Sequence, residues 1–317
     1  MALSNDDHLA TLSKDLIQAL DNLSGLHPGF RPAHAKGIML SGVFHPAASA
    51  GSLTRAPHVQ RQSTPVTVRF SDSGGVPTVA DNDPNVAGPR GIAIRFHLAE
   101  HVHTDIIGHS TDGFPVRTAE EFLEFLRARH ASGPGAPKPT PVESFLATHP
   151  AALKFVQTPK PIPASFAKES FFTVTAFKFT NKAGNSRYGR FRIRPDGGAE
   201  YLDAQAAAAK SANFLFDEIV ERLAKHPVTF HIMVQLAVDS DTVDDSTVQW
   251  PDDRAQIEFG TIVLTERIPE DDVEKRRIIF DPIPRVDGID SSGDPLLDVR
   301  AAVYLMSGRR RRAAGAS

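Results

Sequence analysis

The stretch Pro65-Val66-Thr67-Val68-Arg69-Phe70-Ser71 decides the fold class of this chain. Its apolar side chains alternate with Thr67, Arg69 and Ser71, which is the two-residue period of a β-strand with one apolar face. The run 91–97, Gly-Ile-Ala-Ile-Arg-Phe-His, alternates in the same way. Further strands are predicted at residues 37–44, 170–180, 186–194, 227–239, 258–266 and 272–280. Because strands at hairpin spacing leave unpaired edges, we expect this antiparallel sheet to close into a barrel.

Helices are predicted before, between and after the strands. They are expected at residues 9–24, from the capping box Thr118–Glu121 onward, around residues 214–223, and at residues 295–307 with Gly308 as the terminating residue. Residues 132–142 contain four prolines and are expected to form a loop. The predicted fold class is therefore α+β, an antiparallel β-barrel with inserted and flanking helices. No repeat or linker divides the chain, so residues 1–317 are expected to form a single domain.

The composition excludes several classes of protein. The chain has 317 residues and no cysteine, which excludes a disulfide scaffold, an iron–sulfur cluster, a cysteine-ligated zinc site and a cysteine nucleophile. The formal net charge of −3 gives no general attraction to nucleic acid or to an anionic membrane. No run approaches 18 apolar residues, and the acidic N-terminus has no apolar core of a secretion signal. We therefore expect a cytoplasmic protein.

Two segments near the first strands carry side chains suited to chemistry. His34 lies just before a predicted strand, three residues after Arg31. A hydrogen-bonded turn histidine is the ordinary explanation for such a residue. Arg69 and Ser71 project from one face of their strand. They are solvated if that face is exposed, whereas in a cleft Arg69 needs an anion and Ser71 can orient a neighbour.

Three further motifs each allow two interpretations. His101 and His103 would share one face of a strand and suit a metal ion, or they belong to a polar surface strand. Arg300 and Tyr304 lie one helical turn apart, so the cation could reach the phenol and favour the phenolate, an oxygen ligand suited to ferric iron. The alternative is a core tyrosine beside a snorkelling arginine. The run 309–312 of four arginines is typical of a solvated tail.

The order of these segments resembles that of haem catalases. The matching stretches are Arg31–Gly37 (R-x-x-H-A-K-G), Val68–Ser71 (V-R-F-S), Pro89–Phe96, Asp105–Gly108, Thr247–Pro251, Ile279–Pro282 and Arg300-x-x-x-Tyr304. Together they span residues 31–304, and the chain lacks the long wrapping segment and C-terminal helical region of large catalases. The sequence therefore looks most like a catalase-related peroxidase, a minimal haem protein of the catalase superfamily.

This resemblance implies a cofactor and the residues that hold it. Tyr304 would be the axial ligand of a ferric haem b (heme b), and Arg300 would keep the phenol deprotonated. The residues matching positions that pair with the haem propionates are Arg31, Arg69 and Arg311. Those matching aromatic positions against the porphyrin are Phe114 and Phe122.

The resemblance also implies the reaction. His34 would move a proton between the two oxygens of a peroxide, and Ser71 would hydrogen-bond the far side of its ring. Catalases have a distal asparagine after the Asp-x-x-Gly stretch, whereas this chain has His109 and Ser110. The missing amide weakens the binding of a second peroxide. The expected activity is therefore a haem-dependent peroxidase that reduces hydrogen peroxide or an organic hydroperoxide and oxidises a small organic donor, with weak catalase activity as a side reaction.

Two other functions remain open from the sequence. One is a catalase-like lipid hydroperoxide isomerase of the allene oxide synthase type, although such enzymes have threonine beside the distal histidine and Ala33 stands there in this chain. The other is a haem-binding protein without turnover. No nucleic-acid or membrane partner is expected, no stretch matches an NADPH site, so none is claimed, and a homo-oligomer is among the options for assembly.

Overall fold

A closed antiparallel barrel forms the centre of the molecule, in a computed structural model that describes residues 6–269 and 278–314. Within these residues, eight strands pair in the order β10-β11-β1-β2-β3-β4-β6-β8, and β8 pairs again with β10 to close the ring. Their bounds are β1 (Gly37–Pro46), β2 (Thr64–Ser71), β3 (Gly91–Ala99), β4 (Val102–His109), β6 (Phe171–Phe172), β8 (Ser186–Pro195), β10 (Val228–Leu236) and β11 (Gln256–Arg267). Closure leaves no free strand edge in the ring.

Four shorter strands lie outside the ring. β7 (Phe177–Thr180) pairs with β8 and also with β12 (Ile289–Ser291), so both extend the sheet beyond the barrel. β5 (Ile162–Pro163) and β9 (Tyr201–Leu202) form a separate two-stranded sheet.

Phenylalanine fills the interior of the barrel. Its most deeply buried rings are Phe44, Phe70, Phe96, Phe166, Phe171, Phe179, Phe191, Phe230 and Phe259. Many of them meet in tilted or edge-to-face pairs, such as Phe44 with Phe96 at 5.0 Å between centroids. A buried phenylalanine needs no hydrogen-bond partner, whereas a buried tyrosine does. The nine phenylalanines of this core therefore contribute to the excess of 20 Phe over 3 Tyr in the sequence.

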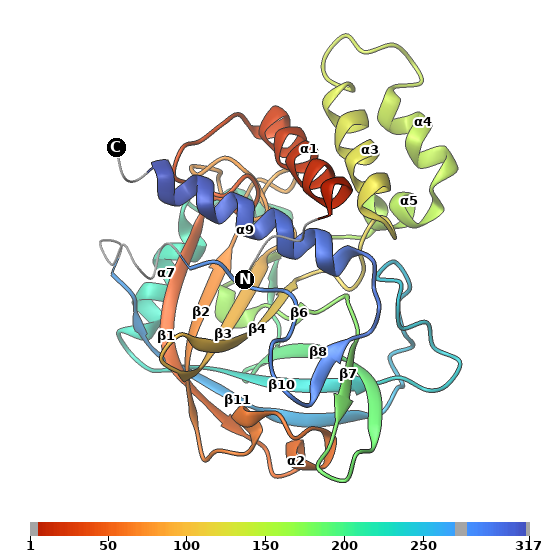
Figure 1. The fold of residues 1–317 in the computed structure, drawn as a ribbon. Coiled ribbons are helices and arrows are strands. Elements are labelled where there is room, and N and C mark those ends of the chain that lie inside the picture. The colour runs from red at the N-terminus through yellow and green to blue at the C-terminus, as the bar shows by residue number, and fades with distance from the viewer. Residues whose placement is uncertain (1–5, 270–277, 315–317) are drawn as a thin grey trace.

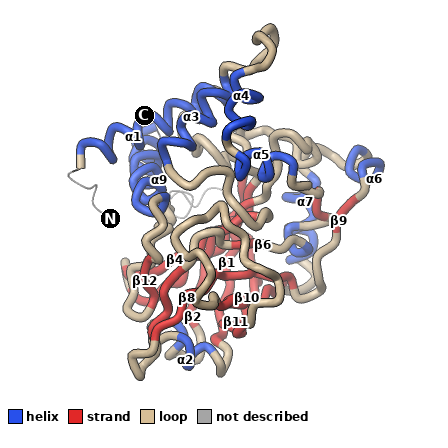
Figure 2. The backbone as a smooth tube through the Cα atoms, turned by 90° about the vertical axis from the view of Figure 1, so that its right-hand side faces the viewer, coloured by secondary structure: helices blue, strands red, loops and turns tan. Residues whose placement is uncertain are grey.

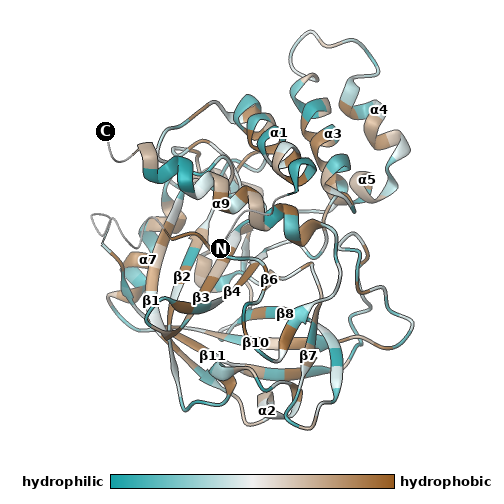
Figure 3. Cartoon of the chain, in the orientation of Figure 1, coloured by the Kyte–Doolittle hydropathy of each residue, from teal (hydrophilic) through white to brown (hydrophobic). Residues whose placement is uncertain are grey.

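Three helices pack together over one end of the barrel. They are α1 (Asp7–Ser24), α3 (Ala119–His130) and α9 (Leu296–Ala314), and their shared core includes Leu12, Leu16, Leu123 and Val299. Figures 1 and 2 both place these helices at one end, with α2 (Ala50–Leu53) at the opposite end. In Figure 3, helix α1 carries both hydrophobic and hydrophilic residues, as its leucine spacing predicts.

Two further pairs of helices lie between strands in the sequence. α4 (Pro141–Thr148) and α5 (Pro150–Gln157) continue from α3, and α6 (Ala204–Ala208) and α7 (Phe214–Leu223) lie between β9 and β10 in the chain. Short 3-10 turns occur at Pro57–Val59 and Phe166–Lys168. No helix in the described ranges is long and apolar enough to cross a membrane.

The predicted fold class is confirmed, and several predicted elements need correction. The capping box of Thr118 with Glu121 is present, and α1 and α7 lie where they were expected. The predicted strand 170–180 is two strands, β6 and β7, and the predicted loop 132–142 ends at Pro141, the first residue of α4. Most of the predicted strand 272–280 lies outside the described residues, and residues 278–280 belong to no strand.

The prediction that Gly308 ends the last helix is wrong. Helix α9 continues to Ala314, so Gly308 lies inside it. A Cβ atom on Gly308 would come within 2.3 Å of the Ile279 side chain, so this glycine allows the segment that carries Ile279 to pack closely on the helix. The arginine run is likewise part of α9 and not a solvated tail: Arg310 pairs with Asp21 on α1, and Arg311 is buried.

Candidate active site

A cavity of about 270 Å³ lies between α1, α9 and the ends of strands β2, β3 and β4. Its apolar walls are formed by Leu16, Leu20, Ile92, Ile107, Phe114, Phe122, Val174, Ile279, Phe280, Leu296, Val299 and Val303. Its polar side chains are Arg31, His34, Arg69, Ser71, His109, Arg300, Tyr304, Ser307 and Arg311. All of these lining residues are described, and none carries a carboxylate. Every residue that the resemblance assigns to the site therefore lines one cavity.

A cross-strand row at the edge of this cavity sets its most polar part. Ser71 at the end of β2 pairs with Gly91 at the start of β3, and Gly91 pairs with His109 at the end of β4. His34, from the segment before β1, places its Nδ1 3.0 Å from Ser71 Oγ, so the expected contact is present. A Cβ atom on Gly91 would lie 2.7 Å from His34 Nδ1 and 2.7 Å from Ser71 Oγ. The absence of a side chain at Gly91 therefore makes the space that the imidazole occupies.

The backbone of His34 is held in a strained conformation. Its φ of 55° lies in the left-handed region, which costs a non-glycine residue roughly 1–3 kcal/mol. The His34 N–H donates to Ser73 O at 3.0 Å, and Arg69 Nη2 donates to His34 O at 2.8 Å. Strain that is maintained by hydrogen bonds on both sides indicates a required orientation of the side chain.

The charge state of His34 follows from its surroundings. Burial, and next the positive charge of Arg69, lower the pKa of His34 to about 3, with smaller contributions from His109 and Arg31. A hydrogen bond to the backbone of Asp72 acts in the opposite direction. The imidazole is therefore neutral at pH 7 and can accept a proton.

Three arginines line the cavity close enough together to lower one another's pKa. Burial lowers the pKa of Arg69 to about 9 and of Arg311 to about 10, and burial with the charges of Arg69 and Arg311 lowers the pKa of Arg31. Arg31 Nη2 donates to Ile278 O at 3.0 Å, while Arg311 Nε is buried without a hydrogen-bond partner. In the described part of the chain, none of the three forms an ion pair. Such a cluster suits a ligand with more than one negative charge.

Tyr304 enters the cavity from α9 with Arg300 one turn earlier. The Arg300 guanidinium carbon lies 5.9 Å from the centroid of the Tyr304 ring, and its Nη1 donates to Thr175 Oγ1 at 3.4 Å. The predicted reach of Arg300 to the phenol oxygen is thus seen only as a contact with the ring. The phenol oxygen itself makes no hydrogen bond with the described residues, which leaves it open to a ligand in the cavity.

Several lining residues were not predicted from the sequence. Phe114 and Phe122 were expected, and their rings lie 5.1 Å apart. Val299 and Val303 belong to the face of α9 that presents Arg300 and Tyr304, so extending the helical spacing would have found them. No local pattern in the sequence predicts that α1 lines the cavity or that residue 91 must be a glycine.

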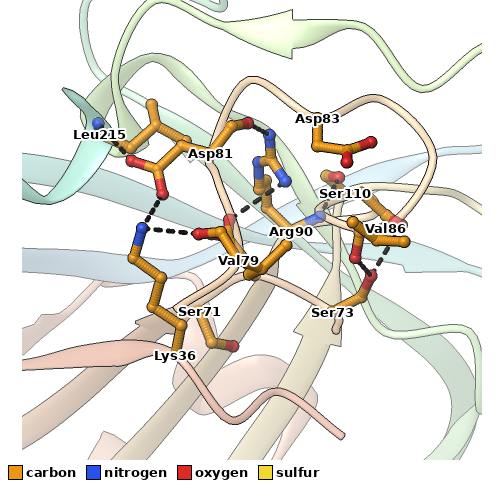
Figure 4. A network of polar contacts seen from close by, with 12 residues as sticks. Lys36, Ser71, Ser73, Val79, Asp81, Asp83, Val86, Arg90, Ser110 and Leu215 are labelled. Carbon is orange, nitrogen blue, oxygen red and sulfur yellow. Dashed lines mark hydrogen bonds and ion pairs between the residues drawn. The ribbon is translucent and has the colours of Figure 1, made fainter. Parts of the chain in front are cut away.

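A polar network behind the row fixes the loop between β2 and β3 (Figure 4). Lys36 pairs with Asp81, and Asp81 Oδ2 accepts from the backbone N–H of Leu215 at 2.8 Å. Arg90 pairs with buried Asp72 at 3.1 Å, and the Arg90 backbone N–H donates to Ser110 Oγ at 2.9 Å. These contacts connect the residues next to Ser71, Gly91 and His109, so the row is supported by a network of its own.

A second network brings a distant segment to the cavity. Arg95 on β3 binds both carboxylate oxygens of Asp105 on β4, at 2.8 and 2.7 Å. The same pair also binds the backbone of residues 279–281. Arg95 donates to Ile279 O, and Asp105 Oδ2 accepts from the Asp281 N–H at 2.7 Å. This arrangement places Ile279 and Phe280 against the cavity.

The metal interpretation of His101 and His103 has no support. His101 lies in the turn before β4 with a φ of 59°, so the two imidazoles do not share a strand face. Within the described residues, no group of three histidine, aspartate or glutamate side chains could hold a metal ion.

The donor set of the cavity suits a haem. Apolar and aromatic walls match a porphyrin, and the three unbalanced arginines match its two propionates. The phenol of Tyr304, which makes no hydrogen bond with the described residues, is an oxygen donor of a type that ferric haem accepts. The imidazoles of His34 and His109 line the same cavity and interact with each other, since His109 contributes to the lowered pKa of His34.

Comparison with known proteins identifies a matching family. The sequence pattern of the family described as Catalase matches residues 19–316. Two proteins named catalase-related peroxidase, from Mycolicibacterium paratuberculosis and Synechococcus elongatus, are each 33% identical over 93% of this chain, and the matches cover 93% and 87% of those proteins. Catalase-2 of Arabidopsis thaliana is 28% identical, over 93% of this chain and 63% of its own.

Solved structures share the fold. A fungal catalase and catalase A from Saccharomyces cerevisiae each superpose with a TM-score of 0.79 at 23% identity. Each match covers 93% of this chain, but only 62% and 64% of those longer chains.

Proposed function

The chain belongs to the catalase family and is an oxidoreductase that acts on peroxide, and we propose that it is a haem-dependent peroxidase that oxidises a small organic donor. The observation that carries this proposal is the meeting of His34, Tyr304 and the three arginines in one cavity. Tyr304 would hold haem b as its axial ligand, and Arg31, Arg69 and Arg311 would bind the propionates. When bound, the haem supplies the redox-active iron at which the O–O bond of peroxide is cleaved.

The proposed role of His34 is to move the proton that this cleavage requires. A neutral imidazole can take the proton from one peroxide oxygen and deliver it to the other, which then leaves as water or an alcohol. The low pKa of His34 supports this role because it keeps the ring neutral when peroxide arrives. Ser71 orients the ring through Nδ1, and the space at Gly91 admits it.

The second substrate is proposed to be an organic electron donor. Oxygen release requires a second peroxide in a productive pose, which the amide of a distal asparagine supports in catalases, and His109 stands at that position here. A donor needs only access to the haem edge.

The first experiment is an absorption spectrum of the purified protein, followed by two parallel assays. We expect a ferric haem spectrum with an axial phenolate, and faster oxidation of an aromatic dye by peroxide than oxygen release from peroxide alone. Sustained oxygen release with negligible dye oxidation would identify a true catalase. Conversion of a fatty-acid hydroperoxide without a donor would identify an isomerase, and haem without turnover would identify a binding protein.

The proton-transfer role has its own test. His34→Ala should lower the rate of reaction with peroxide by about 10²–10⁴-fold while the haem content stays unchanged. His130→Ala, at an exposed residue of α3, is the matched control and should react at the parent rate. A single haem domain over residues 1–317, a cytoplasmic location and a homo-oligomeric assembly remain predictions.

A further inference from the structure

His109 occupies a defined place beside His34. It ends β4, where it pairs with Gly91 on one side and with Phe172 of β6 on the other. Gly91 lies between Ser71 and His109 in the cross-strand row and has no side chain. The imidazole of His34 lies directly against the Gly91 backbone, and His109 is close enough to lower the pKa of His34. Two imidazoles therefore line the same part of the cavity.

The hydrogen bonds of His109 define which of its nitrogens is a donor. The backbone N–H of Thr111 points to His109 Nδ1 at 3.3 Å, and an N–H can only donate, so Nδ1 is the acceptor. A neutral ring then carries its hydrogen on Nε2. Burial, followed by the positive charges of Arg300 and Lys160, lowers the pKa of His109 to about 4, which agrees with a neutral ring. Nε2 makes no hydrogen bond with the described residues, and the ring lines the cavity.

His34 offers the complementary group. Its Nδ1 is occupied by Ser71, so its Nε2 is the nitrogen available to take a proton. A hydroperoxide carries one O–H donor and two oxygen acceptors. The pocket has one acceptor on His34 and one fixed N–H donor on His109. It can therefore bind both the O–H and an oxygen of a hydroperoxide.

We propose that the Nε2–H of His109 binds a peroxide oxygen while His34 accepts the peroxide proton. The inference rests on the proposed function of the cavity and adds to it a substrate-binding residue that differs from the asparagine of catalases. Because the Thr111 N–H fixes Nδ1 as the acceptor, the donor keeps one orientation. The imidazole of His109 thus supplies one hydrogen bond, which the amide of an asparagine could also supply.

Fluoride tests this donor without turnover. It is an anion that binds ferric haem proteins and can accept a hydrogen bond but not donate one. We would titrate the haem-loaded protein with fluoride at pH 7 and follow the absorption spectrum for the parent, His109→Phe, His109→Leu and His109→Asn. One hydrogen bond to a charged acceptor corresponds to about 10–100-fold in affinity, so the Phe and Leu variants should bind fluoride that much more weakly.

The other variants separate the effect of the hydrogen bond from the effect of ring size. His109→Asn restores a donor and should stay within about threefold of the parent, well inside the effect of one hydrogen bond. His103→Phe changes a histidine of the same strand that does not line the cavity, and should bind fluoride like the parent. Unchanged affinity in both His109→Phe and His109→Leu would refute the donor role, and equal weakening in His109→Asn would show that ring size acts instead. A parent protein without a haem spectrum would overturn the proposed function, and the role of His109 with it.

Discussion

The backbone of Gly91 packs directly against the imidazole of His34, so that a Cβ atom at residue 91 would lie 2.7 Å from His34 Nδ1. This relationship joins the start of β3 to a segment that lies more than fifty residues earlier in the chain. It shows why a residue with no functional group of its own is part of the site. The same absence of a side chain brings His34 beside His109.

Gly91→Ala is expected to displace the His34 ring from Ser71. Because the His34 ring and the Ser71 hydroxyl both crowd this position, we expect the rate of reaction with peroxide to fall by about 10–100-fold, a partial loss of the general acid–base contribution. Haem content should stay the same, and stopped-flow absorbance measures the rate. Gly51→Ala in α2 is the control, because a Cβ atom there meets nothing within 4 Å. A parent-like rate in Gly91→Ala would show that the ring has room to move.

Tyr304→Phe is expected to remove the proposed haem ligand while keeping the ring, which packs against the shared core of α1, α3 and α9. We expect haem loss or severe depletion with little change in the unfolding midpoint, since the substitution is nearly isosteric. Absorption per protein and thermal unfolding measure the two effects. Tyr188→Phe, on β8 and away from the cavity lining, should retain the parent spectrum. A normal ferric-phenolate spectrum in Tyr304→Phe would exclude this ligand.

Arg311 and Arg312 provide a matched pair for the propionate site. Arg311 is buried and lines the cavity, whereas Arg312 is exposed. Loss of a charge-assisted hydrogen bond should speed haem transfer from Arg311→Ala to apomyoglobin by about tenfold or more. Arg312→Ala should release haem at the parent rate. Equal rates in the two variants would assign the propionates to other residues.

His58 makes the fold sensitive to acid. It is 1% exposed and lies among the rings of Phe44, Phe96 and Phe259, with Nδ1 unbonded. Burial, followed by the charge of Arg61, lowers the pKa of His58 to about 3, whereas the unfolded chain titrates near 6.5. The unfolded state therefore binds more protons between these values. The stability that His58 contributes is present above about pH 6.5 and is lost as the pH falls towards 3.

His58→Phe is expected to remove this dependence. Between pH 7 and pH 5 the parent should lose about 2 kcal/mol of unfolding free energy through His58 alone. The total loss in the variant should be smaller than that of the parent by roughly this amount. Urea unfolding at the two pH values measures the difference. His45→Phe, at an exposed histidine of β1, is the control and should follow the parent. Parallel pH profiles for parent and His58→Phe would show that His58 does not titrate in this window.

Local patterns predicted the elements because those patterns depend on near neighbours. The alternation of residues 65–71 is that of β2, the leucine spacing of residues 9–24 is that of α1, and the capping box at Thr118 is that of α3. The same reasoning failed at Gly308, where the helix-ending preference of glycine was outweighed by packing against Ile279. It also failed to separate β6 from β7.

The sequence by itself determined the fold class, the family resemblance and the identity of the chemical groups, since each of these depends on residue types, their periods and their order along the chain. Only the tertiary structure decided which groups meet. Barrel closure brings the ends of β2, β3 and β4 into one row, and the α9 helix then places Tyr304 and Arg311 over that row's cavity. The strained backbone of His34, the space at Gly91 and the hydrogen bond from Thr111 to His109 are contacts between segments or across turns. No local periodicity encodes them, because their geometry depends on how the closed sheet positions each strand end.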